Sequence, residues 1–293
     1  MHNLRILYRF LQPVWLMFAI LTYILGTGIA HYLGEQISGI VFWLGFTWLL
    51  LIQMAAYLLS GYYRPSNEPL IAGETNSARV RLRTVFLQLS AAFLTLVAAL
   101  TVIMLRLRLV TPSSGVLLGF IFLLLMAYSI PPLRMANTGI GELIIAVLLA
   151  DLIPGVAFLL QSDQFHRILS IVTFPLTMLA VAYLLALEFR TFASDLKYGR
   201  GTLLIRLTWP RAVILHHVLI IASYGLFVIS PFFGFPWSVL WPVFLTIPLA
   251  GYQIILLRNI ASGGKPIWPL LSVNGIAIFG LSVYLLTLSF WLH

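Results

Sequence analysis

Long apolar segments, separated by short polar ones, follow one another along almost the whole chain. Each apolar segment holds about 20 residues, the length that crosses a bilayer as a helix. The segments are apolar on all sides and do not alternate with polar residues, so the pattern predicts helices and not the strands of a membrane barrel. The predicted membrane-spanning helices are nine, at about residues 13–34, 39–61, 86–108, 115–130, 140–161, 169–190, 211–229, 237–257 and 268–291.

Composition agrees with this pattern. Only 9% of the residues are charged and 61% are hydrophobic, with a mean hydropathy of +1.03. We therefore predict an all-α, polytopic integral membrane protein, with residues 1–293 forming a single transmembrane domain. The chain has no cysteine, which excludes disulfides, thiol nucleophiles and thiolate metal sites.

The basic residues predict the orientation, because short loops rich in lysine and arginine stay on the cytoplasmic side. With the N-terminus cytoplasmic, 14 of the 17 lysines and arginines fall on the inside, and only Arg106, Arg108 and Arg167 fall outside. The net charge of +9 lies in short loops at membrane ends and not in a basic soluble domain. Topology and anionic lipid explain it better than nucleic acid, which is not a predicted partner.

Two connections on the predicted inside, residues 62–85 and 190–210, hold most of the polar chemistry. Long polar loops on one side of a helical bundle usually cap a cavity that opens to that side. We therefore predict a central cavity within the bundle, with its polar end at the cytoplasmic boundary.

The second predicted helix carries Gln53, Tyr57 and Gly61 at spacings that place them on one face. An unpaired amide in a bilayer is costly, so Gln53 must find a partner. Two interpretations stay open: a hydrogen bond between helices, or a residue that lines a polar cavity.

Asp151 lies nine residues after Glu142 in the fifth predicted helix. That spacing puts Asp151 about 13 Å deeper, near the middle of the membrane. An ionisable group at this depth indicates function by default. A hydrogen-bonded structural acid near a kink at Pro154 is the alternative.

At the end of the sixth predicted helix, Glu188, Thr191 and Asp195 share one stripe if the helix continues, beside basic Arg190 and Lys197. Acids on one face can hold Mg²⁺ through oxygen atoms, and neighbouring cations can hold phosphate oxygens. A solvated face of salt bridges is the alternative interpretation.

Three passages resemble the UbiA-type prenyltransferases, a family of nine-helix intramembrane enzymes that transfer an isoprenyl group from its diphosphate. NEPLIAG (residues 67–73) resembles the family's NRPLxxG, and AYSIPPLRMANTGIGELI resembles YSxPPLRLKxxGxGEL. EFRTFASDLKYGRGTLLIRL resembles EFPDYxxDxxxGKRTLxxRLG. The order and spacing of the passages agree with the family, and the branch that prenylates dihydroxynaphthoate in menaquinone synthesis is nearest.

The family binds Mg²⁺ and diphosphate through two acidic motifs, roughly NDxxDxxxD and DxxxD. This chain departs from both. Gln53 stands at the family asparagine, Met54 and Tyr57 stand at acids, and Gly61 stands at the last aspartate. In the second motif Thr191 replaces the first aspartate and Asp195 remains. Two divalent ions need more oxygen ligands than these positions supply.

The resemblance implies a role for each candidate residue. Asp195 and Glu188 are the catalytic acids and the ligands of a single Mg²⁺, which is weakly bound or absent. The residues expected to bind diphosphate are Arg64, Arg134, Lys197 and Arg200. The residues expected to line the cavity are Gln53, Tyr57, Tyr128, Asp151 and Thr191.

The implied activity is that of a divergent prenyltransferase in quinone-type biosynthesis, with a polyprenyl diphosphate and a hydrophobic acceptor as partners, alongside membrane lipid. The expected location is a bacterial or archaeal cell membrane, with the active site on the cytoplasmic side. The alternatives are a non-catalytic membrane protein that binds isoprenoid or quinone, and a terpene cyclase of the same superfamily. A transporter is less favoured, because no pair of broken helices recurs in repeated halves.

Overall fold

The structure is a computed structural model that describes residues 7–65, 68, 70, 74–162 and 164–293. Within this part of the chain all regular structure is helical, and nine segments are long and apolar enough to cross a membrane. The prediction of an all-α, nine-span protein is therefore confirmed. Five of the first six spans are single helices: α2 (Pro13–Tyr32), α3 (Gly39–Tyr62), α4 (Asn76–Arg106), α5 (Pro112–Ser129) and α8 (Arg167–Lys197).

Three of the other four spans are interrupted by a change of helix type near a proline. The fifth span is divided into α6 (Gly141–Val147), a π-helical turn η2 (Leu148–Leu152) and α7 (Ile153–Leu159). The last three spans are α10 (Trp209–Ile229) with the 3₁₀ turn η3 (Ser230–Phe233), α11 (Trp237–Leu240) continued by η4 (Trp241–Thr246) and α12 (Ile247–Ala261), and α13 (Trp268–Leu292). Two short helices, η1 (Met135–Asn137) and α9 (Leu203–Leu207), lie in connections. Pro154 begins α7 after the π turn, where its missing N–H does least harm.

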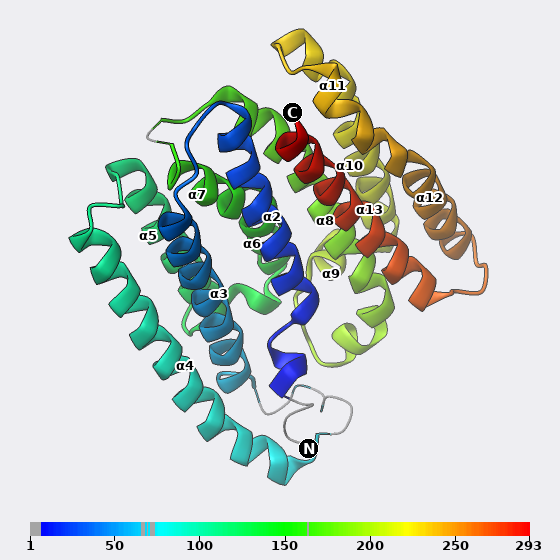
Figure 1. Cartoon of the computed structure of the whole chain (residues 1–293). Coiled ribbons are helices and arrows are strands. Elements are labelled where there is room, and N and C mark those ends of the chain that lie inside the picture. The colour runs from blue at the N-terminus through cyan, green and yellow to red at the C-terminus, as the bar shows by residue number, and fades with distance from the viewer. Residues whose placement is uncertain (1–6, 66–67, 69, 71–73, 163) are drawn as a thin grey trace.

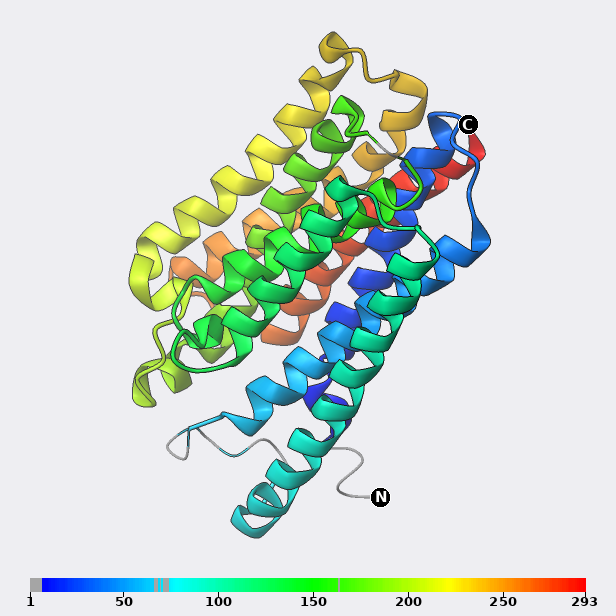
Figure 2. The same ribbon diagram turned by 90° about the vertical axis from the view of Figure 1, so that its left-hand side faces the viewer.

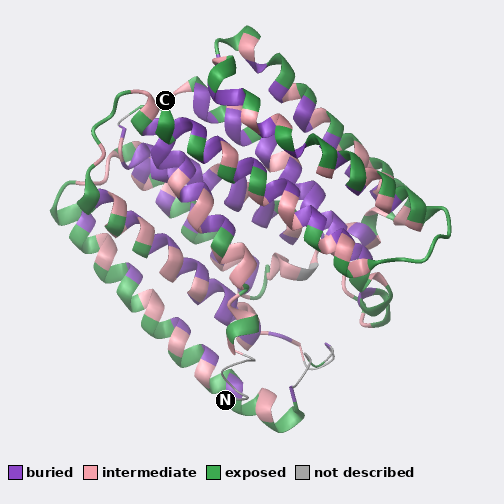
Figure 3. Cartoon of the chain, turned by 45° about the vertical axis from the view of Figure 1, so that its right-hand side comes forward, coloured by how far each residue is buried: buried purple, intermediate pink, exposed green. Residues whose placement is uncertain are grey.

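Helix α8 lies inside the bundle, where α10, α13, α6 and η2 pack around it (Figure 1). Helix α4 lies at the edge and packs along α3, as the view in Figure 2 also shows. Burial follows this order: the inner helices are buried over most of their surface, whereas the outer helices are exposed along one side (Figure 3). The exposed sides are apolar, as expected of surfaces that face lipid.

Close contact between α2 and α7 depends on a glycine. A Cβ atom at Gly26 would lie 2.1 Å from the carbonyl oxygen of Pro154. Small residues let membrane helices approach each other in this way, where burial from water supplies little driving force. Nearby, the rings of Phe18, Tyr183 and Phe279 pack edge to face, which joins α2 to α8 and α13.

Two helices extend further than their apolar segments. Helix α4 begins at Asn76, capped by the Thr75 side chain, which accepts a hydrogen bond from the Ala78 N–H. The connection predicted over residues 62–85 is therefore about half helix, because hydropathy marks only the part of a helix that enters lipid. Helix α8 continues to Lys197, so Glu188, Thr191 and Asp195 do lie on one continuous helix.

The polar connections meet at one end of the bundle. The end of α3, the start of α4, the end of α5 and the end of α8 all lie at the end where α2 begins, and α13 finishes at the opposite end (Figure 1, Figure 2). We call the first of these the arginine end. Its assignment to the cytoplasm rests on the distribution of charge and stays a prediction.

Candidate active site

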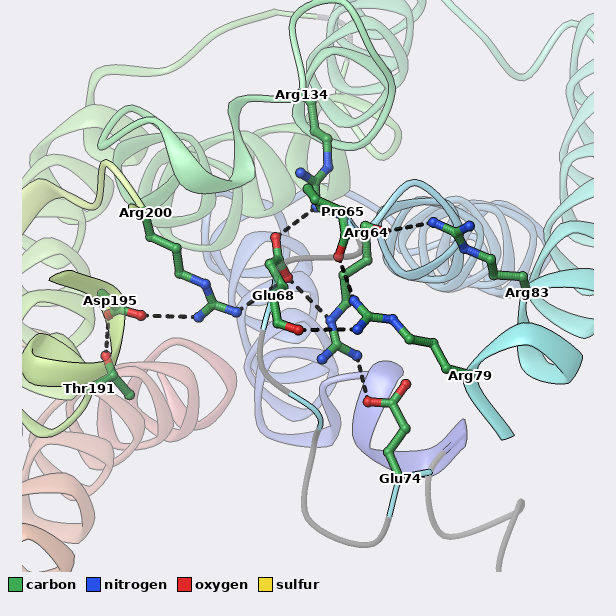
Figure 4. Close-up of polar contacts among 10 residues, drawn as sticks. All are labelled: Arg64, Pro65, Glu68, Glu74, Arg79, Arg83, Arg134, Thr191, Asp195 and Arg200. Carbon is green, nitrogen blue, oxygen red and sulfur yellow. Dashed lines mark hydrogen bonds and ion pairs between the residues drawn. The ribbon is translucent and has the colours of Figure 1, made fainter. Parts of the chain in front are cut away.

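Four arginines from three connections and one helix surround Glu68 at the arginine end (Figure 4). Arg64 Nε lies 3.2 Å from Glu68 Oε2, Arg134 Nη2 lies 3.1 Å from Oε1, and Arg200 Nη2 lies 3.3 Å from Oε2. Arg79 donates to the backbone carbonyl oxygens of Pro65 and Glu68. We call Arg64, Arg79, Arg134 and Arg200 the arginine cluster.

Two further acids connect the cluster to its surroundings. Arg64 Nη1 lies 2.8 Å from Glu74 Oε2, in the connection that precedes α4. Arg200 Nη1 lies 3.1 Å from Asp195 Oδ1, near the end of α8. Glu68, Glu74 and Asp195 are all nearly inaccessible to solvent, which strengthens these ion pairs relative to surface pairs. The network holds four guanidinium groups against three carboxylates and therefore keeps a positive charge.

Asp195 is held on both carboxylate oxygens. Arg200 occupies Oδ1, and the Thr191 hydroxyl donates to Oδ2 at 2.6 Å. The i, i+4 spacing of Thr191 and Asp195 on α8 brings them together, and the turn after Lys197 returns Arg200 toward the same carboxylate. Thr191 therefore is a hydrogen-bond partner of Asp195, at the position where the resembling family has the first aspartate of its second motif.

A cavity of about 200 Å³ adjoins the cluster. Its wall combines charged, polar and aromatic side chains from α2, α3, α5 and the connections. The residues that line it are Arg9, Phe10, Gln12, Trp15, Tyr57, Ser60, Gly61, Arg64, Glu68, Tyr128, Arg134, Ala136 and Arg200. We call it the basic cavity.

Three donor groups in the wall of the basic cavity have no acceptor among the described residues. Tyr57 Oη, Arg134 Nε and Arg200 Nε are buried and make no hydrogen bond within the described part of the chain. Buried donors are almost always paired in native proteins, so three unpaired ones in one wall indicate a bound group that supplies acceptors. Such a ligand must carry several oxygen atoms, because the three donors come from separate elements.

A second cavity, of about 170 Å³, shares Trp15, Tyr128 and Ala136 with the basic cavity. We call it the acidic cavity, because Glu142 of α6 and Glu188 of α8 both line it. Its remaining wall is mostly apolar, with Ile145, Leu184 and Leu187 among its residues. The two cavities therefore place a basic compartment beside a smaller compartment that holds two acids.

The acids of the second cavity face each other. Glu188 Oε2 accepts a hydrogen bond from the Leu204 N–H at 2.7 Å, which fixes the side chain against α9. Glu188 Oε1 and Glu142 Oε2 are buried and receive no donor from the described residues. The two carboxyl groups are in contact, but a pair of carboxylates has no hydrogen to share. A proton held between them, or a donor on a ligand, would satisfy both.

The other candidate residues lie apart from these cavities. Lys197 is exposed, with its ammonium over the Tyr198 ring, and it lines neither cavity. Gln53 is fully buried on the same face of α3 as Tyr57 and Gly61, yet its amide atoms have no hydrogen-bond partner among the described residues. Asp151 lines a separate cavity toward the opposite end of the bundle.

The donor set does not fit a pair of Mg²⁺ ions. Both oxygens of Asp195 are engaged by Arg200 and Thr191, and Glu188 is directed to Leu204 and Glu142. The described residues contain no group of three or more histidine, aspartate or glutamate side chains placed to hold a metal ion. A guanidinium group beside Asp195 also competes with a cation for the same carboxylate.

Sequence reasoning gave Glu68 and Glu142 no main role in the site. Glu68 lies in a connection and outside the two acidic motifs of the resembling family, so only the folded chain shows that three arginines converge on it. Glu142 is the first-turn acid of α6, a position that the helix dipole alone explains. Most of the NEPLIAG passage lies outside the described residues, and only its Glu68 and Leu70 are described.

Comparison with solved structures identifies the fold. Digeranylgeranylglyceryl phosphate synthase superposes with a TM-score of 0.69 at 14% identity, over 100% of both chains. A UbiA homolog from Archaeoglobus fulgidus bound to geranyl diphosphate (GPP) and Mg²⁺ superposes with a TM-score of 0.66 at 18% identity, over 98% of this chain and 99% of that one. The chain has the UbiA-type fold.

The same homolog bound to dimethylallyl diphosphate (DMAPP) and Mg²⁺ gives a TM-score of 0.64 at 17% identity, over 96% of this chain and 98% of that one. At this level of identity the likeness shows how the helices are arranged and not which reaction they support. No protein-family model matches the chain, and no curated protein matches it in sequence. The function must therefore be argued from the two cavities.

Proposed function

We propose that the chain binds a polyprenyl diphosphate in the basic cavity and transfers the isoprenyl group to a hydrophobic acceptor. The observation that carries this proposal is the set of unpaired buried donors, Tyr57 Oη, Arg134 Nε and Arg200 Nε, in one wall. A diphosphate offers many acceptor oxygens within a few ångströms. Arginine suits it because the planar guanidinium donates two parallel hydrogen bonds to phosphate oxygens.

The charge of the cluster supports the same ligand. Glu68 already binds one face of Arg64, Arg134 and Arg200, which holds these side chains in place without a ligand. A diphosphate beside Glu68 would accept hydrogen bonds from Arg134 Nε and Arg200 Nε, which have no acceptor among the described residues. Preorganised cations of this kind stabilise the negative charge that develops on a departing diphosphate.

The transfer of the isoprenyl group then needs no reactant besides the diphosphate, the acceptor and a base that takes the acceptor's proton. The bond between the allylic carbon and the diphosphate oxygen breaks, and its electron pair leaves with the diphosphate. The acceptor attacks the allylic cation and gives up a proton. The Glu142 and Glu188 pair in the adjoining acidic cavity is placed to take that proton. The rings of Trp15 and Tyr128, in the wall between the cavities, can stabilise the cation.

The proposal also includes the chemical class of the acceptor and the role of a metal ion. A phenolic, quinone-type acceptor of the menaquinone branch fits the three resembling passages. A Mg²⁺ ion at Asp195 and Glu188 stays a prediction, and no step above passes through it. If Mg²⁺ binds, it supplies additional positive charge for the diphosphate. The arginine cluster provides such charge by itself.

The test is binding and turnover of geranyl diphosphate by the purified protein in nanodiscs, with Mg²⁺ and with EDTA. Binding is expected in both conditions, because the arginines carry it. Arg200→Ala should weaken binding about tenfold or more, the usual consequence of losing hydrogen bonds to a charged group. Arg258→Ala is the matched control, since Arg258 is an exposed arginine outside both cavities.

An equal loss of binding in Arg200→Ala and Arg258→Ala would show that the ligand does not sit in the basic cavity. Complete loss of binding in EDTA would show that a metal, and not the arginine cluster, holds the diphosphate. Turnover is measured as diphosphate release against a panel of phenolic acids and lipids.

One observation favours a non-catalytic isoprenoid-binding protein as the second candidate. Asp195, the one aspartate that the resemblance retains in the second motif, is ion-paired with Arg200 and hydrogen-bonded to Thr191. A carboxylate held on both oxygens does not need a metal to be stable. Tight binding of geranyl diphosphate with no turnover in any acceptor panel would favour this candidate over the transferase.

A further inference from the structure

Asp151 lines a cavity of about 560 Å³ that is separate from the two cavities of the candidate active site. Its wall comes from the π turn η2, the first half of α8 and the end of α10 with η3. The residues that line it are Val147, Asp151, Ser170, Ile171, Thr173, Phe174, Pro175, Thr177, Leu226, Ile229, Ser230 and Phe233. We call it the Asp151 cavity.

The position of the cavity places it in the bilayer. Thr173 lies about 9 Å along α8 from Arg167, and Asp151 lies about 12 Å from the end of α7, at about 1.5 Å per residue. Thr173 is therefore in the half of the membrane opposite the arginine cluster, and Asp151 lies near the middle of the membrane. Phe174, Ile229 and Phe233 are exposed on the outer surface of the bundle, so the cavity opens sideways toward lipid.

The backbone around Asp151 departs from a regular α-helix. Asp151 lies within the π turn, and its side chain contacts Thr173 of α8. π turns are rare and occur frequently at functional sites. On the facing helix, Pro175 has no N–H to donate to the carbonyl of Ile171, which also lines the cavity. Two adjacent helices are thus irregular at the same place.

The carboxyl group is only half satisfied. The Thr173 hydroxyl donates to Asp151 Oδ1 at 2.5 Å, and no donor among the described residues reaches Oδ2. An acceptor without a donor is costly in a membrane, where water does not supply one. The rest of the wall offers hydroxyl groups and apolar or aromatic side chains but no cation.

From these observations we infer that the Asp151 cavity binds a membrane lipid whose head is a hydroxyl group and whose body is an apolar chain. The hydroxyl donates to Asp151 Oδ2, and the chain lies against Phe174, Phe233 and Leu226. The volume is in the range of small-molecule sites, and a mostly apolar wall with a few fixed polar groups is typical of them. A phosphate head is excluded because it would meet the carboxylate without a cation.

The test uses a long-chain alcohol with a photoreactive diazirine in its chain, and the methyl ether of the same alcohol, on the full chain in nanodiscs. The alcohol should label peptides of α8 and α10. The ether, which cannot donate, should label them about tenfold less, as expected for the loss of a hydrogen bond to a charged group. Equal labelling by alcohol and ether would overturn the inference without any variant.

Variants locate the contact. Asp151→Leu should lose the labelling to the same degree as the ether, with folding checked by thermal melting. Thr173→Val should weaken labelling less, because Thr173 only orients the carboxyl group; Thr95→Val, an exposed threonine on α4, is its matched control and should label normally. Full labelling of Asp151→Leu would overturn the inference. Affinity for geranyl diphosphate should be unchanged in these variants, so this test and that of the proposed function fail independently.

Discussion

The two longest helices, α4 and α8, look alike in sequence and differ in the structure. Each has 31 residues, and the most apolar window of each has a mean hydropathy of 2.2. Yet 72% of that window is buried inside the protein in α8 and only 17% in α4. Hydropathy reports that a side chain avoids water, but lipid and protein satisfy an apolar side chain equally. Hydropathy alone therefore does not separate a central helix from a peripheral one.

What distinguishes α8 is the set of polar groups that other helices satisfy. Thr173 reaches Asp151 of η2, and the Ser223 hydroxyl of α10 donates to the carbonyl of Pro175. Further along, Glu188 accepts from Leu204, and Asp195 pairs with Arg200. Helix α4 has charged residues only near its two ends, Arg79, Arg81 and Arg83 at the arginine end and Arg106 in its last turn, and it contacts α3 along one side. Polar side chains at depth thus mark the helix that the other helices surround.

Glu188→Gln should have the largest effect. If Glu188 takes the proton from the acceptor, turnover should fall about a hundredfold or more, the usual contribution of a general base. Glutamine keeps an oxygen for the Leu204 N–H, so the helix ends should stay in place. Rates are measured as diphosphate release, alongside the affinity for geranyl diphosphate.

That affinity should hardly change, because Glu188 does not line the basic cavity. Loss of affinity equal to the loss of rate would assign Glu188 to binding or to folding. Unchanged turnover would remove it from the reaction altogether.

Substitution of one leucine on each helix tests directly whether α8 is buried and α4 is exposed. Leu179 on α8 is 1% exposed, and Leu96 on α4 is 51% exposed. Leu179→Ala should reduce the free energy of unfolding by about 2–5 kcal/mol, because a cavity remains inside the bundle. Leu96→Ala should change it by about 0.5 kcal/mol or less, as surface substitutions usually do. Thermal midpoints in one detergent measure both; equal shifts would show that α4 is buried by a partner.

A small loss of stability is expected from a substitution at the contact between α4 and α3. The Trp48 indole N–H donates to the Thr101 hydroxyl at 2.8 Å, which joins the two helices. Thr101→Val should reduce the free energy of unfolding by about 0.6 kcal/mol, the average for hydrogen bonds between membrane helices. The midpoint should shift by a degree or two, and turnover should stay normal. A large loss of turnover would show that α4 acts on the site through α3.

Prediction from sequence succeeded where one physical signal decides the outcome. The nine spans follow from apolar length, and α8 carries Glu188, Thr191 and Asp195 on one helix because no proline or glycine lies between Glu188 and Lys197. Arg64, Arg134 and Arg200 were named as candidates for diphosphate binding, and the structure brings all three to one cavity. Their role stays a proposal.

Prediction was weaker where distant residues must meet. Lys197 was grouped with the arginines by its place in the sequence, but its ammonium lies over the Tyr198 ring and it lines neither cavity. Asp151 was expected in the central cavity, whereas the structure gives it a cavity of its own. The convergence of three arginines on Glu68 joins residues up to 132 positions apart, and no local pattern encodes such a contact.

Three properties can be derived from the amino-acid sequence: the nine helical membrane spans, the connections where polar residues concentrate, and the passages that resemble a known family. These properties depend on local composition and on the fixed cost of burying charge or backbone in lipid. Only the tertiary structure decided which helix lies inside, which acids meet which arginines, and which donors remain unpaired. Those outcomes depend on how the helices pack, and packing brings together side chains whose separation in the sequence carries no signal.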